Sequence, residues 1–257
     1  MKCVTAGQVF RWQEVEPDNW RGADGANWYQ VQVCSGHLNI VSNADKKAFE
    51  SLFRLDENYA LLREEFCERE PRFREVADAT KGLRSMRCSD PVEVLLAFIC
   101  SSLNNIPRIT NMMNHLAGGE LFPRLEQIAM LQEQGLREAG FGYRAKYVCG
   151  ASRLALELGG EDWLQSLRNQ PTEMAIQELM TLPGVGRKVA ECIALIGLDK
   201  TDAVPVDTHV AQAVKRIEKT SSTITNPKTR DWITERFGNK AGLAQQMLFY
   251  WNLTSKR

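Results

Sequence analysis

The chain has no excess of either charge, no long hydrophobic run and no paired cysteines. Its 257 residues carry 32 Lys and Arg against 32 Asp and Glu, so no overall basic field marks a nucleic-acid-binding surface, although local clusters can still do so. The longest apolar run, residues 94–100, is too short to span a bilayer, and no leader of basic then apolar residues is present. We therefore expect an intracellular protein that does not cross a membrane.

The cysteines and histidines do not suggest a metal site. There are seven cysteines, an odd number, scattered along the chain: Cys3, Cys34, Cys67, Cys88, Cys100, Cys149 and Cys192. Such a pattern without a C-x-x-C pair is typical of reduced thiols. The three histidines do not cluster with the cysteines at ligand spacing. We predict no catalytic metal.

Roughly the first 45 residues alternate polar and apolar side chains. The alternation is clear over residues 8–12 and 29–33 and continues at Leu38 and Ile40, with turn signals at Asp24-Gly25 and Ser35-Gly36. This pattern predicts a small antiparallel sheet with one buried face.

From residue 45 onward the apolar spacing becomes helical. Residues 90–93 (DPVE) predict a helix start with an aspartate N-cap, a proline at the first helical position and a capping-box glutamate, before a buried helix through 94–100. Further helices are predicted over 107–117, 124–132, 145–158, 162–169, 208–218, 227–236 and 241–252. The predicted class is α+β: a small N-terminal antiparallel β-sheet domain with covering helices, residues 1–70, then a mainly α-helical body of two subdomains, residues 71–257.

A glycine turn joins two helices within residues 173–197. Residues 182–186 (LPGVG) contain two glycines, Gly184 and Gly186, which permit left-handed dihedrals and expose backbone N–H groups. The second helix presents its positive N-terminal end at the same turn. This arrangement suits a phosphate.

Lys188 lies in the first turn of that second helix. The helix dipole and the neighbouring Arg187 both oppose protonation, so we expect its pKa to be depressed. A partly neutral amine can attack an electrophilic carbon and form a Schiff base. The alternative is that Lys188 only binds a phosphate or is solvated.

Three neighbouring residues have a chemical and an ordinary interpretation each. Asp207 precedes a predicted helix, where it can act as an N-cap or as a carboxylate that stabilises a cationic, sugar-like transition state. Cys192 shares a helix face with Lys188 and could contact it, or it fills the core. His209 could contact a phosphate or lie on a solvated face. Spacing alone leaves these alternatives open.

A second loop combines glycine, aromatic and basic residues. Residues 140–147 read GFGYRAKY. Such a loop tip can stack on a flat group while its charges meet phosphates.

Residues 182–210 (LPGVGRKVAECIALIGLDKTDAVPVDTHV) resemble the helix-hairpin-helix, Gly/Pro-rich, aspartate-containing motif of the base-excision DNA glycosylases, and in particular the 8-oxoguanine DNA glycosylases. Other segments similar to that family occur in its order: 7–12, 98–106, 142–147 and 244–249. The resemblance spans nearly the whole chain. It implies a monomeric bifunctional enzyme that excises 8-oxoguanine from duplex DNA and cleaves the resulting abasic site.

The resemblance also implies roles for residues of the base pocket. Lys188 matches the lysine that attacks the deoxyribose C1′, and Asp207 the aspartate that assists. Cys192 and Phe249 match the residues that stack on the two faces of the flipped base. Gly7 matches the glycine whose carbonyl accepts the N7 hydrogen, which 8-oxoguanine has and guanine lacks.

Two further positions complete the implied pocket, and others contact the DNA. Gln245 matches the glutamine at the Watson–Crick edge of the base, and Asn252 replaces an aspartate of the pocket. His209 matches the histidine on a neighbouring phosphate. The implied DNA-binding set also includes Asn105, Gly184 and Gly186 and the following strand-opening residues: Leu103, Arg108, Tyr143 and Arg144.

Leu103 departs from the family. Tyr143 resembles the wedge, and Arg108 and Arg144 resemble the readers of the cytosine left opposite the lesion. Leu103 stands where the family usually has an asparagine that fills the vacated space and bonds that cytosine. Leucine can fill the space but cannot form the hydrogen bond, which places the preference for cytosine in doubt.

Three alternatives to this function exist. The iron–sulfur branch of the superfamily has four closely spaced cysteines after the motif, and none follows Cys192 here. A glycosylase for another oxidised base and a non-catalytic DNA-binding module are the others. The resemblance implies no cofactor beyond a monovalent or divalent cation at the hairpin carbonyls when DNA is bound, and a location in the bacterial cytoplasm or nucleoid or the eukaryotic nucleus.

Overall fold

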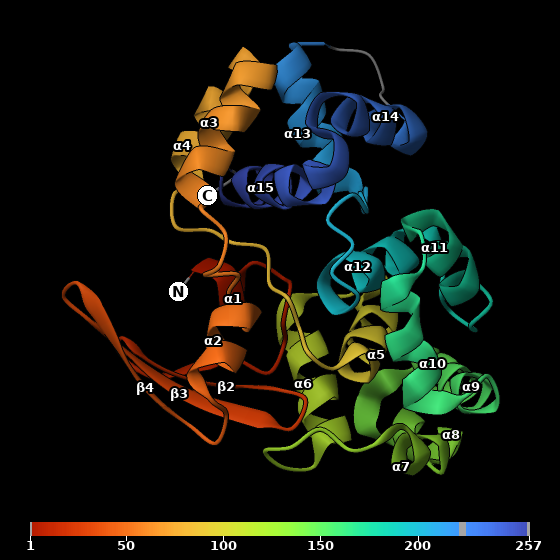
Figure 1. Cartoon of the computed structure of the whole chain (residues 1–257). Coiled ribbons are helices and arrows are strands. Elements are labelled where there is room, and N and C mark those ends of the chain that lie inside the picture. Colours follow the sequence, from red (N-terminus) through yellow and green to blue (C-terminus); the bar gives the residue numbers. More distant parts are fainter. Residues whose placement is uncertain (1, 221–224, 256–257) are drawn as a thin grey trace.

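The computed structural model describes residues 2–220 and 225–255. An antiparallel sheet occupies the N-terminal part, at the lower left of Figure 1, with its strands in sequence order. The strands are β1 (Gln13–Glu16), β2 (Asn19–Asp24), β3 (Asn27–Cys34) and β4 (His37–Ser42). Helix α2 (Lys46–Leu52) covers one face, where the ring of Phe49 lies 5.7 Å from that of Tyr29. The predicted sheet is confirmed.

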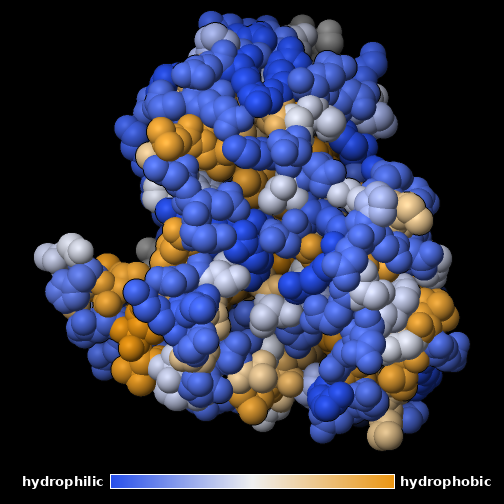
Figure 2. Space-filling model, in the orientation of Figure 1, coloured by the Kyte–Doolittle hydropathy of each residue, from blue (hydrophilic) through white to orange (hydrophobic). Residues whose placement is uncertain are grey.

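Two details of the sheet prediction were wrong. Residues 8–12 form no strand, because the polar side chain of Gln8 turns inward and bonds to distant backbone while Phe10 and Trp12 pack in the core. The buried face does not extend to β4, where Leu38 and Ile40 are exposed. The β3–β4 hairpin projects from the body in Figure 1, and hydrophobic surface gathers over the sheet in Figure 2.

The helical part of the chain has two regions. One holds helices that are consecutive in sequence, at the lower right of Figure 1: α5 (Pro91–Ser101), α6 (Ile106–Ala117), α7 (Leu125–Ala129), α8 (Glu133–Leu136), α9 (Arg144–Glu157), α10 (Gly160–Ser166), α11 (Thr172–Met180) and α12 (Arg187–Gly197). A π-helical turn over Arg137–Phe141 and a 3-10 turn over Leu167–Asn169 connect some of them. The predicted helices are present, although α7 is shorter than the expected 124–132.

The second region joins distant parts of the sequence. Its members are α3 (Tyr59–Arg69), α4 (Arg74–Ala79), α13 (Thr208–Glu218), α14 (Asn226–Phe237) and α15 (Ala241–Thr254), with 3-10 turns at Pro71–Phe73 and Gly238–Lys240. The ring of Phe66 lies 4.9 Å from that of Phe237, which fastens α3 to α14. A short helix, α1 (Lys2–Thr5), begins the chain. The α+β class is confirmed, while the division at residue 70 stays a prediction.

Helix α5 begins as predicted, with one correction. Asp90 accepts hydrogen bonds from the N–H groups of Val92 (2.8 Å) and Glu93 (3.4 Å), so it is the N-cap. The predicted capping box is wrong, because the Glu93 carboxylate faces the sheet. It accepts the Gly25 N–H (2.9 Å) and pairs with Arg11 (3.0 Å). Glu93 thus joins the sheet to the helical body.

Within the described ranges, no helix is both long and apolar enough to pass through a membrane.

Candidate active site

A small cavity of about 50 Å³ lies where α5, α12, α15 and the N-terminal segment meet. Its lining contains six residues that the sequence predicted for catalysis or base binding: Gly7, Lys188, Cys192, Asp207, Gln245 and Phe249. The fold brings these residues together from the start, the last third and the end of the chain.

Lys188 and Cys192 lie one turn apart on α12, and both line the cavity, where their side chains interact electrostatically. The Nζ atom of Lys188 also lies 5.7 Å from the centre of the Phe98 ring, which comes from α5. A cation over an aromatic face is favoured electrostatically. The predicted placement of Lys188 and Cys192 on one helix face is confirmed.

The predicted depression of the Lys188 pKa was wrong. The pKa lies above its ordinary value, chiefly because of the negative charge that Cys192 can carry, with Asp207 adding to the shift and burial opposing it. Burial raises the pKa of the Cys192 thiol. Because a protonated thiol carries no charge, the Asp207 carboxylate supports the lysine at neutral pH. The resting side chain is therefore an ammonium ion.

Arg187 does not act on Lys188 as expected, because its charge is already paired. Its guanidinium binds Glu173 of α11 (2.7 Å) and the buried Glu191 (2.8 Å). Glu191 in turn binds Arg230 of α14 (2.6 Å). These ion pairs fasten the first turn of α12 to its neighbours and balance the arginine that was expected to repel Lys188.

Asp207 is both a cap and part of the cavity wall. Its carboxylate accepts the backbone N–H of Val210 (3.0 Å), so it is the N-cap of α13. The same residue lines the cavity. The two interpretations that the sequence left open are therefore compatible.

The base-binding candidates on α15 present polar and aromatic groups to the same space. Gln245 is 3% exposed, and its Oε1 atom has no hydrogen-bond partner among the described residues. A buried polar oxygen in that state is costly unless a ligand donates to it. The ring of Phe249 packs edge-on against that of His209 at 5.5 Å. Gly7, at φ +68°, lies beneath Phe249.

Asn252 lies outside the cavity lining. Its Nδ2 atom is 3.3 Å from Nδ1 of His209 and donates to Gln212 Oε1 at 3.3 Å. Asn252 thus contacts His209 and Gln212 and can orient the imidazole. Its contact with a bound base stays a prediction.

Leu103, in the segment that follows α5, projects into solvent. Leu103 is 94% exposed and has a left-handed backbone, with φ +48°. Tyr143 donates to the Ser102 carbonyl (2.9 Å), and Arg144 donates to the carbonyls of Ser102 (3.0 Å) and Leu103 (2.9 Å). The loop of residues 140–147 therefore holds the leucine outward.

The predicted DNA-reading arginines are engaged within the protein. Arg144 is only 3% exposed, and Arg108 donates to the Gly140 carbonyl (2.9 Å). Asn105 caps α6 by accepting the Arg108 N–H (3.0 Å). Their roles toward DNA stay predictions.

The hairpin between α11 and α12 requires glycine at one position. Gly184 has φ +82°, and a Cβ atom there would lie 2.7 Å from the side chain of Tyr147. Gly186 is the N-cap of α12 in an extended conformation, φ −89°. The left-handed conformation that the sequence allowed in this turn is therefore present at Gly184, and Gly186 is extended.

Comparisons with known proteins agree with this geometry. A family model described as "HhH-GPD superfamily base excision DNA repair protein" matches residues 96–238, and one for the "8-oxoguanine DNA glycosylase, N-terminal domain" matches residues 1–95. The chain belongs to the HhH-GPD superfamily. The predicted resemblance is confirmed.

Relatives in this superfamily include the N-glycosylase/DNA lyase OGG1 of Arabidopsis thaliana, which is 35% identical over 98% of this chain and 76% of its own length. The N-glycosylase/DNA lyase of Saccharomyces cerevisiae is 39% identical over 53% of this chain and 42% of its own. A Clostridium acetobutylicum 8-oxoguanine glycosylase/lyase, solved with double-stranded DNA containing cytosine opposite 8-oxoG, has a TM-score of 0.90 and 28% identity, covering 100% of this chain and 92% of that chain.

Sequence reasoning missed several residues of the cavity wall. Among them are Gln8, Phe98, Pro205 and Gln246. Gln8 and Gln246 directly follow predicted site residues, and Phe98 begins one of the segments that resemble the superfamily, so adjacency was the available signal. Across the described part of the chain, no group of three or more His, Cys, Asp or Glu side chains could hold a metal ion.

Proposed function

We propose that this chain excises 8-oxoguanine from duplex DNA and then cleaves the abasic site through an imine with Lys188. The observation that carries the proposal is the single cavity that joins Lys188 and Asp207 with Gly7, Gln245 and Phe249. It holds a nucleophile, a carboxylate, a flat stacking surface and hydrogen-bonding groups for a base. The relatives named N-glycosylase/DNA lyase support it.

In the first step, Lys188 loses its proton and its Nζ attacks the deoxyribose C1′. The C1′–N9 bond breaks, and the base leaves with that electron pair and gains a proton. Positive charge develops on the sugar, which the neighbouring Asp207 carboxylate stabilises. A helix cap keeps this carboxylate in place without rearrangement.

In the second step, the nitrogen lone pair forms a C=N bond to C1′ while the C1′–O4′ bond breaks and O4′ gains a proton. The sugar ring opens, and the resulting imine keeps Lys188 covalently attached. The imine acidifies the hydrogen at C2′, so that a proton leaves C2′ and the C3′–O bond breaks by β-elimination. Water then hydrolyses the imine and restores Lys188. A mere DNA-binding module has no use for this lysine inside a cavity.

Recognition of the damaged base rests on Gly7. Its carbonyl would accept the N7–H that 8-oxoguanine has, whereas guanine would place a lone pair against the same oxygen. A buried acceptor without a donor is costly, and this cost discriminates against guanine. Gln245 would meet the Watson–Crick edge through its unpaired Oε1. Cys192 and Phe249 would stack on the two faces of the base.

The damaged base can reach the cavity only if it leaves the DNA duplex, and this unstacking costs a few kcal/mol. Leu103 and Tyr143 would fill the vacated space, and Arg108 and Arg144 would face the remaining base. Phosphates would be bound by the hairpin at Gly184 and Gly186, by His209 and by the region of Asn105, since helix N-termini suit anions.

The proposal also covers the oligomeric state, the location and the cation binding of the enzyme. It would act as a monomer inside the cell. A monovalent or divalent cation would bind the hairpin carbonyls with DNA, since hard cations take oxygen ligands, and no step of the reaction passes through it.

An excision assay tests the proposal. The wild-type chain should release 8-oxoguanine from a duplex and cut the strand, and Lys188→Gln should do neither. Lys47→Gln changes an exposed lysine on α2 as the matched control and should retain both activities. Equal product with protein and with buffer would refute the proposal. Salt-sensitive duplex binding in that case would indicate a non-catalytic binding module.

A further inference from the structure

The backbone of Gly7 depends on its surroundings for its direction. Its φ of +68° is a conformation that L side chains rarely adopt, and a Cβ atom there would meet Ile106 at 3.6 Å and Phe249 at 3.7 Å. Because glycine alone imposes little restriction on its own dihedrals, the direction of its carbonyl is set by the residues on either side.

The residue before Gly7 is held by α15. The Nε2 atom of Gln246 donates a hydrogen bond to the Ala6 carbonyl at 3.3 Å. Both residues are buried, with Gln246 7% exposed. A buried carbonyl needs such a partner. Gln246 directly follows Gln245 and lines the same cavity, so one helix carries a base contact and the support of Gly7.

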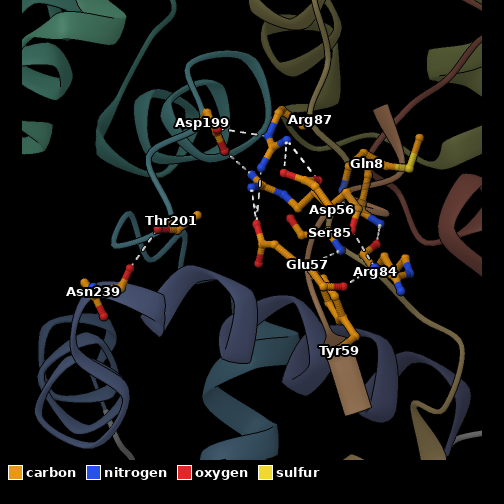
Figure 3. A network of polar contacts seen from close by, with 12 residues as sticks. Gln8, Asp56, Glu57, Tyr59, Arg84, Ser85, Arg87, Asp199, Thr201 and Asn239 are labelled. Atoms are coloured by element: carbon orange, nitrogen blue, oxygen red, sulfur yellow. Dashed lines mark hydrogen bonds and ion pairs between the residues drawn. The ribbon is translucent and has the colours of Figure 1, made fainter. Parts of the chain in front are cut away.

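The residue after Gly7 is held from the other side. Gln8 is 2% exposed. Its Nε2 atom donates to the carbonyls of Cys3 (3.2 Å) and Arg84 (3.0 Å), and its Oε1 atom accepts the N–H of Met86 (2.8 Å). Figure 3 shows Gln8 beside the extended segment that contains Arg84.

That extended segment is itself fixed. The guanidinium of Arg84 donates to the Glu57 carbonyl (3.0 Å) and lies 4.7 Å from the centre of the Tyr59 ring. The Ser85 N–H donates to the Tyr59 hydroxyl (3.0 Å). Figure 3 shows these residues as one connected network. The support of Gly7 therefore reaches α3, outside the cavity.

We infer that Gln246 and Gln8 are positioning residues that aim the Gly7 carbonyl and thereby set the discrimination between 8-oxoguanine and guanine. The inference rests on the proposed function. Hydrogen bonds weaken steeply with distance and angle. A small rotation of the carbonyl would weaken the bond to N7–H and relieve the repulsion of guanine, while the other base contacts are the same for both bases. Only the difference in binding affinity between 8-oxoguanine and guanine should change.

Two substitutions at Gln246 test this. Gln246→Met keeps the length and removes the donor, and Gln246→Glu keeps the shape and places an oxygen against the Ala6 carbonyl. In a Lys188→Gln background, which cannot react, dissociation constants for duplexes with 8-oxoguanine or guanine opposite cytosine give a discrimination ratio. We expect Gln246→Met to lower the ratio about 3- to 10-fold, as for one hydrogen bond, and Gln246→Glu to lower it further.

The matched control is Gln134→Met, which removes an exposed glutamine that donates to Glu138 and does not line the cavity. It should leave the ratio unchanged. With Lys188 intact, the Gln246 variants should cut a preformed abasic duplex at rates within about twofold of wild type, since no base is present to be read.

A discrimination ratio unchanged in both Gln246 variants would overturn the inference. So would a parallel loss of discrimination and abasic-site cleavage, since that would mean general damage to the fold. Failure of the proposed function has a different signature: the parent chain itself would then show neither discrimination nor cleavage.

Discussion

Lys188 and Cys192 lie one helical turn apart in the wall of the cavity, where their side chains interact electrostatically. The pKa of Lys188 is raised, chiefly by the charge of Cys192, while burial raises the pKa of Cys192. The lysine that the proposed mechanism uses as a nucleophile therefore rests as an ammonium ion and must lose a proton before it reacts.

This resting state predicts a steep pH dependence. Below the pKa of Lys188 the amine fraction grows about 10-fold per pH unit, so the rate of imine formation on an abasic duplex should rise continuously over roughly pH 6 to 9. Burial raises the pKa of Cys192, so its thiolate forms only above this range. Cys192→Ala should therefore follow the wild-type slope up to pH 9 and level off at a lower pH than wild type beyond it. A wild-type rate that is flat above pH 7 would instead indicate a depressed lysine pKa.

Asp207 can be separated into its two roles by substitution. Asparagine is also a good N-cap, so Asp207→Asn should change the free energy of unfolding by less than about 0.5 kcal/mol, whereas Asp207→Ala should cost about 1 kcal/mol. Both variants lose the carboxylate charge, and base excision should fall about 100-fold or more in each. Urea unfolding and single-turnover excision measure the two effects. Activity retained in Asp207→Asn would mean that this residue is only a cap.

Leu103 predicts weak selection of the base opposite the lesion. It is exposed and offers no hydrogen bond. Asparagine tolerates its left-handed backbone and can bond to a base edge, so Leu103→Asn should raise the preference for cytosine over adenine about 3- to 10-fold.

Excision rates against the four opposite bases measure this preference. Leu121→Asn, at another exposed leucine, is the matched control and should leave it unchanged. A wild-type enzyme that already requires cytosine strictly would show that the arginines of this surface suffice.

The raised pKa of Glu93 predicts that the folded chain loses stability as pH rises. Burial raises the pKa of its carboxyl from 4.5 to about 7, against the opposing effect of Arg11. Between these values the folded chain keeps a proton that the unfolded chain releases, so the free energy of unfolding should fall as pH rises through this window, by at most about 3 kcal/mol.

Urea unfolding at pH 5 and at pH 7.5 checks this prediction. Glu93→Gln cannot titrate and should reduce the difference between the two conditions. Asp24 and Asp90, whose pKa values burial also raises, contribute with the same sign. A wild-type free energy that increases over this range, or an equal slope in Glu93→Gln, would contradict the account.

Local signals explain which parts of the fold were predictable. Helix α13 begins after Asp207 and ends at Glu218 as expected, because an N-cap and a periodic apolar face lie within the segment itself. Residues 8–12 were misread, because alternation cannot distinguish a strand from an irregular segment whose glutamine turns inward to bond to distant backbone. The Glu93 side chain was misassigned for the same reason: its partner Gly25 is 68 positions away.

The site was predictable as a set of residues but not in its electrostatics. The resemblance placed Lys188, Gly7 and Gln245 in one pocket, and the structure does the same. The pKa of Lys188 was predicted from its neighbours in sequence, whereas the structure shows Arg187 bound to two glutamates. The support of Ala6 by Gln246 joins residues 240 positions apart, which no sequence pattern reveals.

The most direct test of the proposed chemistry is borohydride trapping. Reduction of the imine during reaction with a duplex containing 8-oxoguanine should join the wild-type chain covalently to the DNA strand, and mass spectrometry of the digested product should place the link at Lys188. Lys47→Gln should be trapped as wild type is, and Lys188→Gln should not be trapped. A wild-type chain that excises the base without a trapped species, or a cross-link that persists in Lys188→Gln, would contradict the proposed role of this lysine.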